Sequence, residues 1–231
     1  MGASIAKQSY PTFEDESMSL FAKHGFNQGS WAGGLRSVLR ERRVLTDKQA
    51  VTRLWRPTWT HWIQFEPIGY TGPAFWFGKP AIIAREEVLY AGYYVERGYA
   101  VHENSEYVMD SGWHWRLLLT TLANTVQRRR MSELMENLPE SRRCIWLLCG
   151  QEPSKRIAYQ DATSLDEMQS VISACDSNDW IDLILGVSFT VDDCLALQEG
   201  VVDELRAPLI RALEIEALIS SSLVTTDIED D

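Results

Sequence analysis

Cys144-Ile-Trp-Leu-Leu-Cys149 is an almost continuous apolar run in a chain of 231 residues. An apolar run of this length predicts a buried β-strand in the interior of a sheet. Further strands are expected at 81–84 and 88–95, with 96–98 as a turn that returns the chain into a strand at 99–102. These segments indicate that a sheet forms the centre of the fold.

The residues before this run predict an aromatic sheet region followed by helices. Residues 55–80 contain eight aromatic side chains and four prolines, which favours short strands and turns over a long helix. Apolar residues recur every three or four positions over 113–130, which predicts one helix with Asp110 or Ser111 as its cap. A second, short helix is expected over 132–138.

The residues after the apolar run are predicted to be mainly helical. Ser164 and Glu167 have the spacing of a capping box, which predicts a helix over 165–175. Thr190 and Asp193 can begin another helix. The expected fold class is α+β, with an aromatic-rich mixed or antiparallel sheet and helices, followed by an acidic helical C-terminal part.

Charge divides the chain near residue 156. Residues 157–231 contain two basic and seventeen acidic residues, a net charge of −15, whereas residues 1–156 contain twenty basic and sixteen acidic residues, a net charge of +4. We therefore expect four regions: a flexible N-terminal arm (1–19), an α+β part (20–156), an acidic helical part packed on it (157–219) and a disordered acidic tail (220–231).

This asymmetry has three interpretations. The acidic part could bind a basic protein, it could dock on the basic part of the same chain, or its carboxylates could simply keep amphipathic helices soluble. A negative field repels phosphate, which argues against a general nucleic-acid binder. The arginine groups at 36–43 and 128–143 are the segments that could contact phosphate.

The apolar stretches and the cysteines predict a cytoplasmic protein with no membrane segment. Every apolar stretch is far shorter than the roughly 20 residues that cross a bilayer, and the first residues lack the apolar core of a signal peptide. The four cysteines do not suggest a disulfide framework, and Cys144 and Cys149 are each expected to behave as a small buried apolar residue. On a strand, Cys144 and Cys149 would point to opposite faces.

No motif for a nucleotide, a metal or a cofactor is found, and no nucleophile motif of a hydrolase. The best candidate for catalysis is a cluster around His102 and His114. In that interpretation His114 is a general base, and Asp110 or Glu103 orients its ring. The alternative interpretation is that Asp110 caps a helix and His114 is a half-buried ring between two tryptophans.

These observations favour a binding or inhibitor protein, of the immunity or antitoxin type, that neutralises a basic partner such as a toxin or a nuclease. Clustered carboxylates steer association with a cationic surface. The expected contact residues crowd the connections of the acidic part: Asp176, Asp179, Asp182, Asp192 and Asp193. The alternative function is a small hydrolase or transferase that uses His114, and a third is a subunit that docks in a homo-oligomer through its tryptophan-rich face.

Overall fold

The computed structural model describes residues 26–32, 61–67, 78–85, 88–101, 107–110, 113–150, 153–176, 179–197 and 200–221. The strands in these ranges are β1 (Phe26–Ala32), β2 (His61–Pro67), β3 (Lys79–Arg85), β4 (Val88–Val101), β5 (Tyr107–Asp110), β6 (Arg143–Cys149), β7 (Lys155–Ala158) and β8 (Ile181–Thr190). The helices are α4 (Trp113–Ala123), α5 (Thr125–Glu136), α6 (Ala162–Ala174), α7 (Val191–Leu197), α8 (Val201–Glu204) and α9 (Arg206–Ser220).

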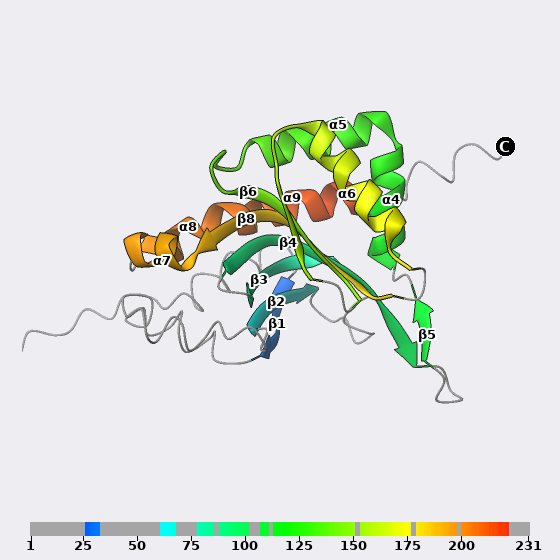
Figure 1. The fold of residues 1–231 in the computed structure, drawn as a ribbon, viewed down its shortest axis with the longest axis horizontal. Helices are drawn as coiled ribbons and strands as arrows, with labels where there is room; N and C mark the ends of the chain where they lie inside the picture. Colours follow the sequence, from blue (N-terminus) through cyan, green and yellow to red (C-terminus); the bar gives the residue numbers. More distant parts are fainter. Residues whose placement is uncertain are drawn as a thin grey trace, which may run out of the picture.

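The strands form one antiparallel sheet in the order β1-β2-β3-β4-β8-β6-β7, and β5 pairs with the last residues of β4. Helices α4, α5, α6 and α9 gather on one side of this sheet, and α7 and α8 lie at one end of it (Figure 1). The predicted α+β class is confirmed. None of the helices in the described ranges combines the length and the hydropathy that a membrane span requires.

The predicted turn at 96–98 is wrong, because β4 continues without interruption from Val88 to Val101. The strand changes partners along its length. Its first ten residues pair with β8, and Gly98 begins the pairing with β5, opposite Asp110. In the predicted hairpin, residues 99–101 would have paired with the first part of β4. They pair with β5 instead.

The strand over 143–149 is confirmed, but its central neighbour β8 was not predicted. β8 lies between β4 and β6, so a segment of the expected helical part, 157–219, contributes a central strand of the sheet. One core cluster contains residues from both sides of residue 156. The change in net charge along the chain does not coincide with a division of the core.

Side-chain alternation gives the sheet two buried faces. The first face packs against the helices and contributes Ile82, Ala84, Leu89, Ala91, Tyr93, Val95, Ile145, Leu147, Leu183, Leu185, Val187 and Phe189 to the larger cluster. The second cluster consists of Ala81, Ile83, Tyr90, Tyr94, Cys144, Trp146, Leu148 and Ile184. Cys144 and Cys149 belong to different clusters, as the alternation predicts.

The single helix predicted over 113–130 is two helices, α4 and α5. Asn124 separates them because its side-chain oxygen accepts hydrogen bonds from the backbone N–H groups of Val126 and Gln127. This cap restarts the helix, which then includes most of the separate helix expected over 132–138.

Helices α6 and α7 agree with their predicted positions, although one cap differs. Thr190 and Asp193 form the expected reciprocal cap: the Asp193 carboxylate accepts from the Thr190 N–H at 2.9 Å, and the Thr190 hydroxyl accepts from the Asp193 N–H at 3.1 Å. At α6 the cap is Asp161 instead of Ser164, because its carboxylate accepts from the Thr163 N–H at 2.8 Å.

Several predictions concern residues outside the described ranges. They include the N-terminal arm (1–19), residues 222–231 of the predicted tail (220–231), and the cluster members His102 and Glu103. The first two residues of that tail are described: Ser220 ends α9, and Ser221 is its C-cap. Of the tryptophans whose side chains are described, Trp115 and Trp146 are each 1% exposed and therefore belong to the core.

Candidate functional site

The five aspartates predicted to contact a partner lie in two groups at opposite ends of β8. Asp176, Asp179 and Asp182 are at the start of this strand, and Asp192 and Asp193 follow its end. A strand of ten residues is about 30 Å long. The structure therefore does not bring all five side chains into one surface.

The carboxyl group of Asp182 points toward the second face of the sheet. The Tyr94 hydroxyl lies 2.7 Å from Oδ1 of Asp182 and also contacts Oε2 of Glu96. Burial, followed by the nearby Glu96 charge, raises the pKa of Asp182 to about 6, although the hydrogen bond with Tyr94 acts in the opposite direction. Asp182 therefore has an internal role in addition to any contact with a partner.

Replacing Asp182 with asparagine is expected to stabilise the protein at pH 7 by about 1 to 3 kcal/mol. A raised carboxyl pKa means that the folded state holds the proton more tightly than the unfolded chain, so wild-type stability falls as the pH rises from about 4 through 6. The amide removes this titration, and it can donate a hydrogen bond to Glu96. Urea unfolding between pH 4 and pH 7 measures the difference.

The control is Asp192→Asn, which removes one exposed carboxylate from α7. This variant keeps Asp182, so its stability should still fall as the pH rises from about 4 through 6. An Asp182→Asn protein whose stability changes with pH in parallel with the wild type would contradict the raised pKa of Asp182 beside Glu96.

Asp176 and Asp179 are held through their backbone carbonyl groups. The Arg97 guanidinium, on β4, donates to the carbonyl oxygen of Asp176 at 2.5 Å and to that of Asp179 at 2.8 and 3.0 Å. This places the connection between α6 and β8 against the sheet. The guanidinium group thus holds this connection through hydrogen bonds to two backbone carbonyl oxygens.

The corner of the molecule formed by α7 and α8 carries a group of acidic residues. Segment 191–204 contains five acidic residues and no basic one. Asp192 and Asp203 are exposed, and Asp193 and Glu204 lie 3.6 and 3.8 Å from the Arg142 guanidinium. We call the four described carboxylates the acidic corner.

Arg142 is fixed at the base of the acidic corner. Its guanidinium carbon lies 4.7 Å from the centre of the Phe189 ring, within the range of a cation–π contact. This stacking places one positive charge between Asp193 and Glu204. The geometry neutralises part of the corner and leaves its outer carboxylates facing solvent.

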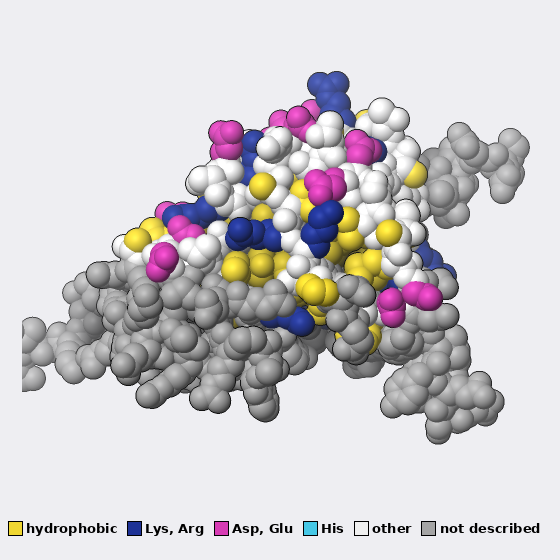
Figure 2. Space-filling view, viewed as in Figure 1, with side chains coloured by type: hydrophobic (Ala, Val, Ile, Leu, Met, Phe, Trp, Pro, Cys, Tyr) yellow, Lys and Arg dark blue, Asp and Glu magenta, His cyan; other side chains and the backbone are white. Residues whose placement is uncertain are grey.

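Further ion pairs join the two differently charged parts of the chain. Arg128 pairs with Asp166 at 2.5 Å, and Lys155 pairs with Glu167 at 2.9 Å. Figure 2 shows acidic and basic side chains interspersed on this side of the molecule. These ion pairs link residues of the acidic part to residues of the basic part.

His114 is only 2% exposed, more deeply buried than the half-buried ring expected of the alternative to catalysis. Its Nδ1 atom lies 3.4 Å from the Tyr93 hydroxyl, and its Nε2 atom lies 3.9 Å from a carboxylate oxygen of Glu216. Asp110 ends β5, but its side chain is outside the described residues, as is Glu103. The polar groups that the structure shows beside His114 were not anticipated.

The electrostatics of His114 favour the neutral ring. Burial, followed by the positive charge of Lys79, lowers the pKa of His114 to about 4. Glu216 does not offset burial, because 3.9 Å is too long for a hydrogen bond and its own pKa is raised by burial. A neutral imidazole packed in the core is poorly placed to take a proton from a substrate.

A surface groove of about 500 Å³ lies elsewhere, between α5 and the start of α6. Its lining combines both signs of charge and includes Arg128, Arg129, Ser132, Glu133, Glu136 and Asp161. Ser132 is already engaged, because it receives a hydrogen bond from Tyr159 and donates one to Glu136, each at 2.8 Å. Among the described residues, no group of histidine, cysteine, aspartate and glutamate has the arrangement of a metal site.

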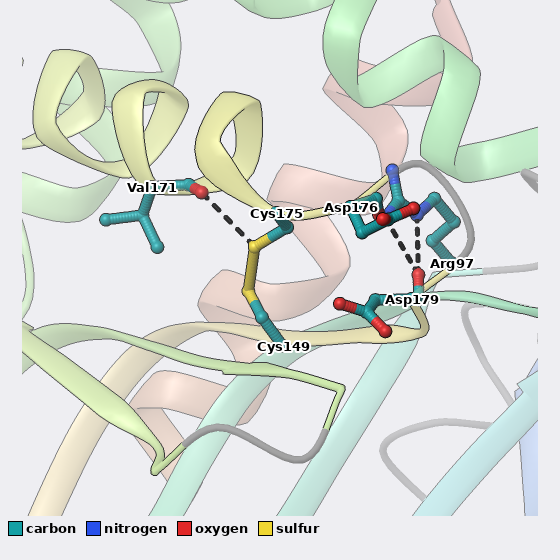
Figure 3. The surroundings of a disulfide bond; sticks show 6 residues. All are labelled: Arg97, Cys149, Val171, Cys175, Asp176 and Asp179. Carbon is teal, nitrogen blue, oxygen red and sulfur yellow. Dashed lines mark hydrogen bonds between the residues drawn. A yellow bond between two sulfur atoms is a disulfide. The ribbon is translucent and has the colours of Figure 1, made fainter.

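The structure confirms the expectation of a buried apolar side chain for Cys144 and corrects the expectation for Cys149, which forms a disulfide. Cys149 and Cys175 form a disulfide, whereas Cys144 and Cys194 are free and buried (Figure 3). The two partners are 26 residues apart in the sequence, and sequence spacing alone does not reveal such a pair. Antiparallel pairing of β6 with β8 brings the end of β6 beside the end of α6.

Comparison with known proteins gives no relative to guide the assignment. No family model matches the chain, and no match is found among curated proteins or solved structures.

Proposed function

We propose that this protein binds a basic protein partner through the acidic corner and acts by occupying that partner, as an inhibitor or immunity protein does. The observation that carries the proposal is the run of five acidic residues without a basic one in segment 191–204. Exposed carboxylates such as those of Asp192, Asp203 and Glu204 attract a cationic surface and raise its rate of association.

The geometry favours this corner over the other predicted aspartates. The Asp182 carboxylate accepts a hydrogen bond from Tyr94. Arg97 donates hydrogen bonds to the backbone carbonyl oxygens of Asp176 and Asp179. Asp192 and Asp203 are instead exposed. They belong to α7 and α8, two short helices at one end of the sheet (Figure 1). A partner with an arginine or lysine cluster would fit this end.

Reversing two charges of the acidic corner is expected to reduce partner binding at low salt about tenfold or more. Each lost attraction and each new repulsion weakens an interface with a cationic surface, and about 1.4 kcal/mol corresponds to a tenfold change in affinity. The variant is Asp192→Lys combined with Asp203→Lys. The amount of basic protein retained from the native cell lysate is measured by quantitative mass spectrometry.

The matched control is Glu133→Lys combined with Glu167→Lys, which changes the net charge equally on α5 and α6. It breaks two exposed ion pairs, each worth about 1 kcal/mol or less. Equal loss of binding in both double variants would mean that net charge matters and that the acidic corner does not. Unchanged binding in the corner variant would refute the proposed location.

A further inference from the structure

We propose that Cys149 and Cys175 are a reversible redox site, which exchanges between a disulfide and two thiols by reaction with a low-molecular-weight disulfide. Cys149 ends β6, and Cys175 is the residue at the C-terminal end of α6. Their Cα atoms are 6.3 Å apart, within the usual range for a disulfide (Figure 3). The pair therefore joins the end of a strand to the end of a helix.

The structure can also accommodate the two cysteines as free thiols. The sulfur of Cys175 lies 3.2 Å from the carbonyl oxygen of Val171, one helical turn earlier. In the thiol form this sulfur can donate a weak hydrogen bond to that oxygen. Cys149 is 8% exposed and belongs to the larger core cluster, where a thiol packs as a small apolar group. Neither state leaves a strongly polar group without a partner.

The two cysteines have different roles in the exchange. Cys175 is partly exposed, whereas Cys149 is buried, so the Cys175 thiolate attacks the incoming disulfide. With glutathione disulfide, the attack releases one glutathione thiol and leaves a mixed disulfide on Cys175. Cys149 then attacks the Cys175 sulfur and releases the second glutathione thiol. Two protein thiols lose two electrons and two protons, and one glutathione disulfide gains them.

We expect reduction of the disulfide to loosen the last turn of α6 and to leave the beginning of the helix unchanged. The first turn is held by the Asp161 cap, and the second turn by the ion pairs of Asp166 and Glu167. The residues after the helix are held separately, because Arg97 binds the carbonyl oxygens of Asp176 and Asp179 (Figure 3). Between these anchors, the disulfide links the end of α6 to the end of β6 in the sheet.

The other two cysteines provide controls within the same chain. Burial raises the pKa of the Cys144 thiol to about 11 and that of Cys194 to about 12. Both side chains are at most 2% exposed. They should remain thiols under conditions in which Cys149 and Cys175 exchange, provided that the protein stays folded.

The first experiment equilibrates the full chain in glutathione buffers of graded ratio and identifies the thiols by alkylation and mass spectrometry. We expect Cys149 and Cys175 to oxidise together and to be reduced again when the ratio is reversed. Amide hydrogen exchange at residues 172–175 should be several-fold faster in the reduced protein, with no change at residues 162–166. Two permanent thiols at every ratio, or a disulfide that no ratio reduces, would overturn the proposal.

A second experiment separates the two roles with single variants. Cys149→Ser should accumulate the glutathione adduct on Cys175, because the resolving thiol is missing. Cys175→Ser should form little adduct on the buried Cys149, and its hydroxyl can keep the hydrogen bond to Val171. Equal adduct formation in both variants, with Cys144 and Cys194 still unreactive, would contradict the assigned order of attack.

Discussion

Replacing Gly186 with alanine is expected to lower the free energy of unfolding by about 3 kcal/mol or more, or to prevent folding. Gly186 lies opposite Gly92 across the two central strands β8 and β4. A Cβ atom on Gly186 would be 2.1 Å from the carbonyl oxygen of Ala91 and 2.8 Å from the Cα atom of Gly92. Both are backbone atoms, so relief requires the two strands to separate.

The matched control is Gly200→Ala. A Cβ atom there would have no neighbour within 4 Å, and the backbone has an ordinary helical φ of −64°. Its stability should stay within about 0.5 kcal/mol of the wild type or rise slightly, because alanine restricts the unfolded chain. Urea unfolding measures both variants. A Gly186→Ala protein as stable as Gly200→Ala would refute the close contact between β4 and β8.

The second large effect concerns pH and His114. Its pKa is about 4 in the folded protein, below the 6.5 of an ordinary histidine. Between these values the unfolded chain binds a proton that the folded protein does not, so stability falls as the pH decreases from about 6.5 toward 4. The shift corresponds to a loss of about 3 kcal/mol from this residue alone. Above about pH 6.5 its contribution is constant.

The comparison with His114→Asn isolates this contribution, because asparagine does not titrate and can still accept a hydrogen bond from Tyr93. The wild type should lose stability relative to the variant as the pH falls. Asp182 changes stability in the opposite direction over part of this range. The quantity to compare is therefore the difference in the free energy of unfolding between the wild type and His114→Asn at each pH. A titration of the His114 ring by NMR near pH 6.5 would contradict its burial among these groups.

The local elements were predictable where neighbouring residues determine them. The strand at 143–149 is a continuous apolar run, and the cap of α7 is formed by two residues three positions apart. The break at Asn124 also has a local cause, since asparagine favours the position before a helix. β8 has a strand-like apolar composition, but the cap motifs before and after it led to a mainly helical prediction for this part.

The arrangement of the polar groups could not be predicted, because it depends on strand order. Tyr94 and Asp182 are 88 residues apart in the sequence and meet only because β4 pairs with β8. His114 likewise meets Glu216 only when α4 packs beside α9. Antiparallel pairing in this register places Glu96 directly opposite Asp182, and sequence spacing does not contain that information.

The charge asymmetry was visible in the sequence, but its meaning was not. Ion pairs such as Arg128–Asp166 join the two charged parts, so some of the acidic residues serve the fold. The acidic corner differs because Asp192 and Asp203 are exposed and no described ion pair uses them. It is this local excess, and not the total charge, that supports partner binding.

The measurement that tests the proposed function most directly is capture from the native cell lysate by the full chain at low and at high salt, with mass spectrometry of what is retained. We predict that a single basic protein is retained in a stoichiometric amount at low salt and is released as higher salt screens the charges. Retention of no basic protein at low salt, or of one that high salt does not release, would contradict binding through the acidic corner.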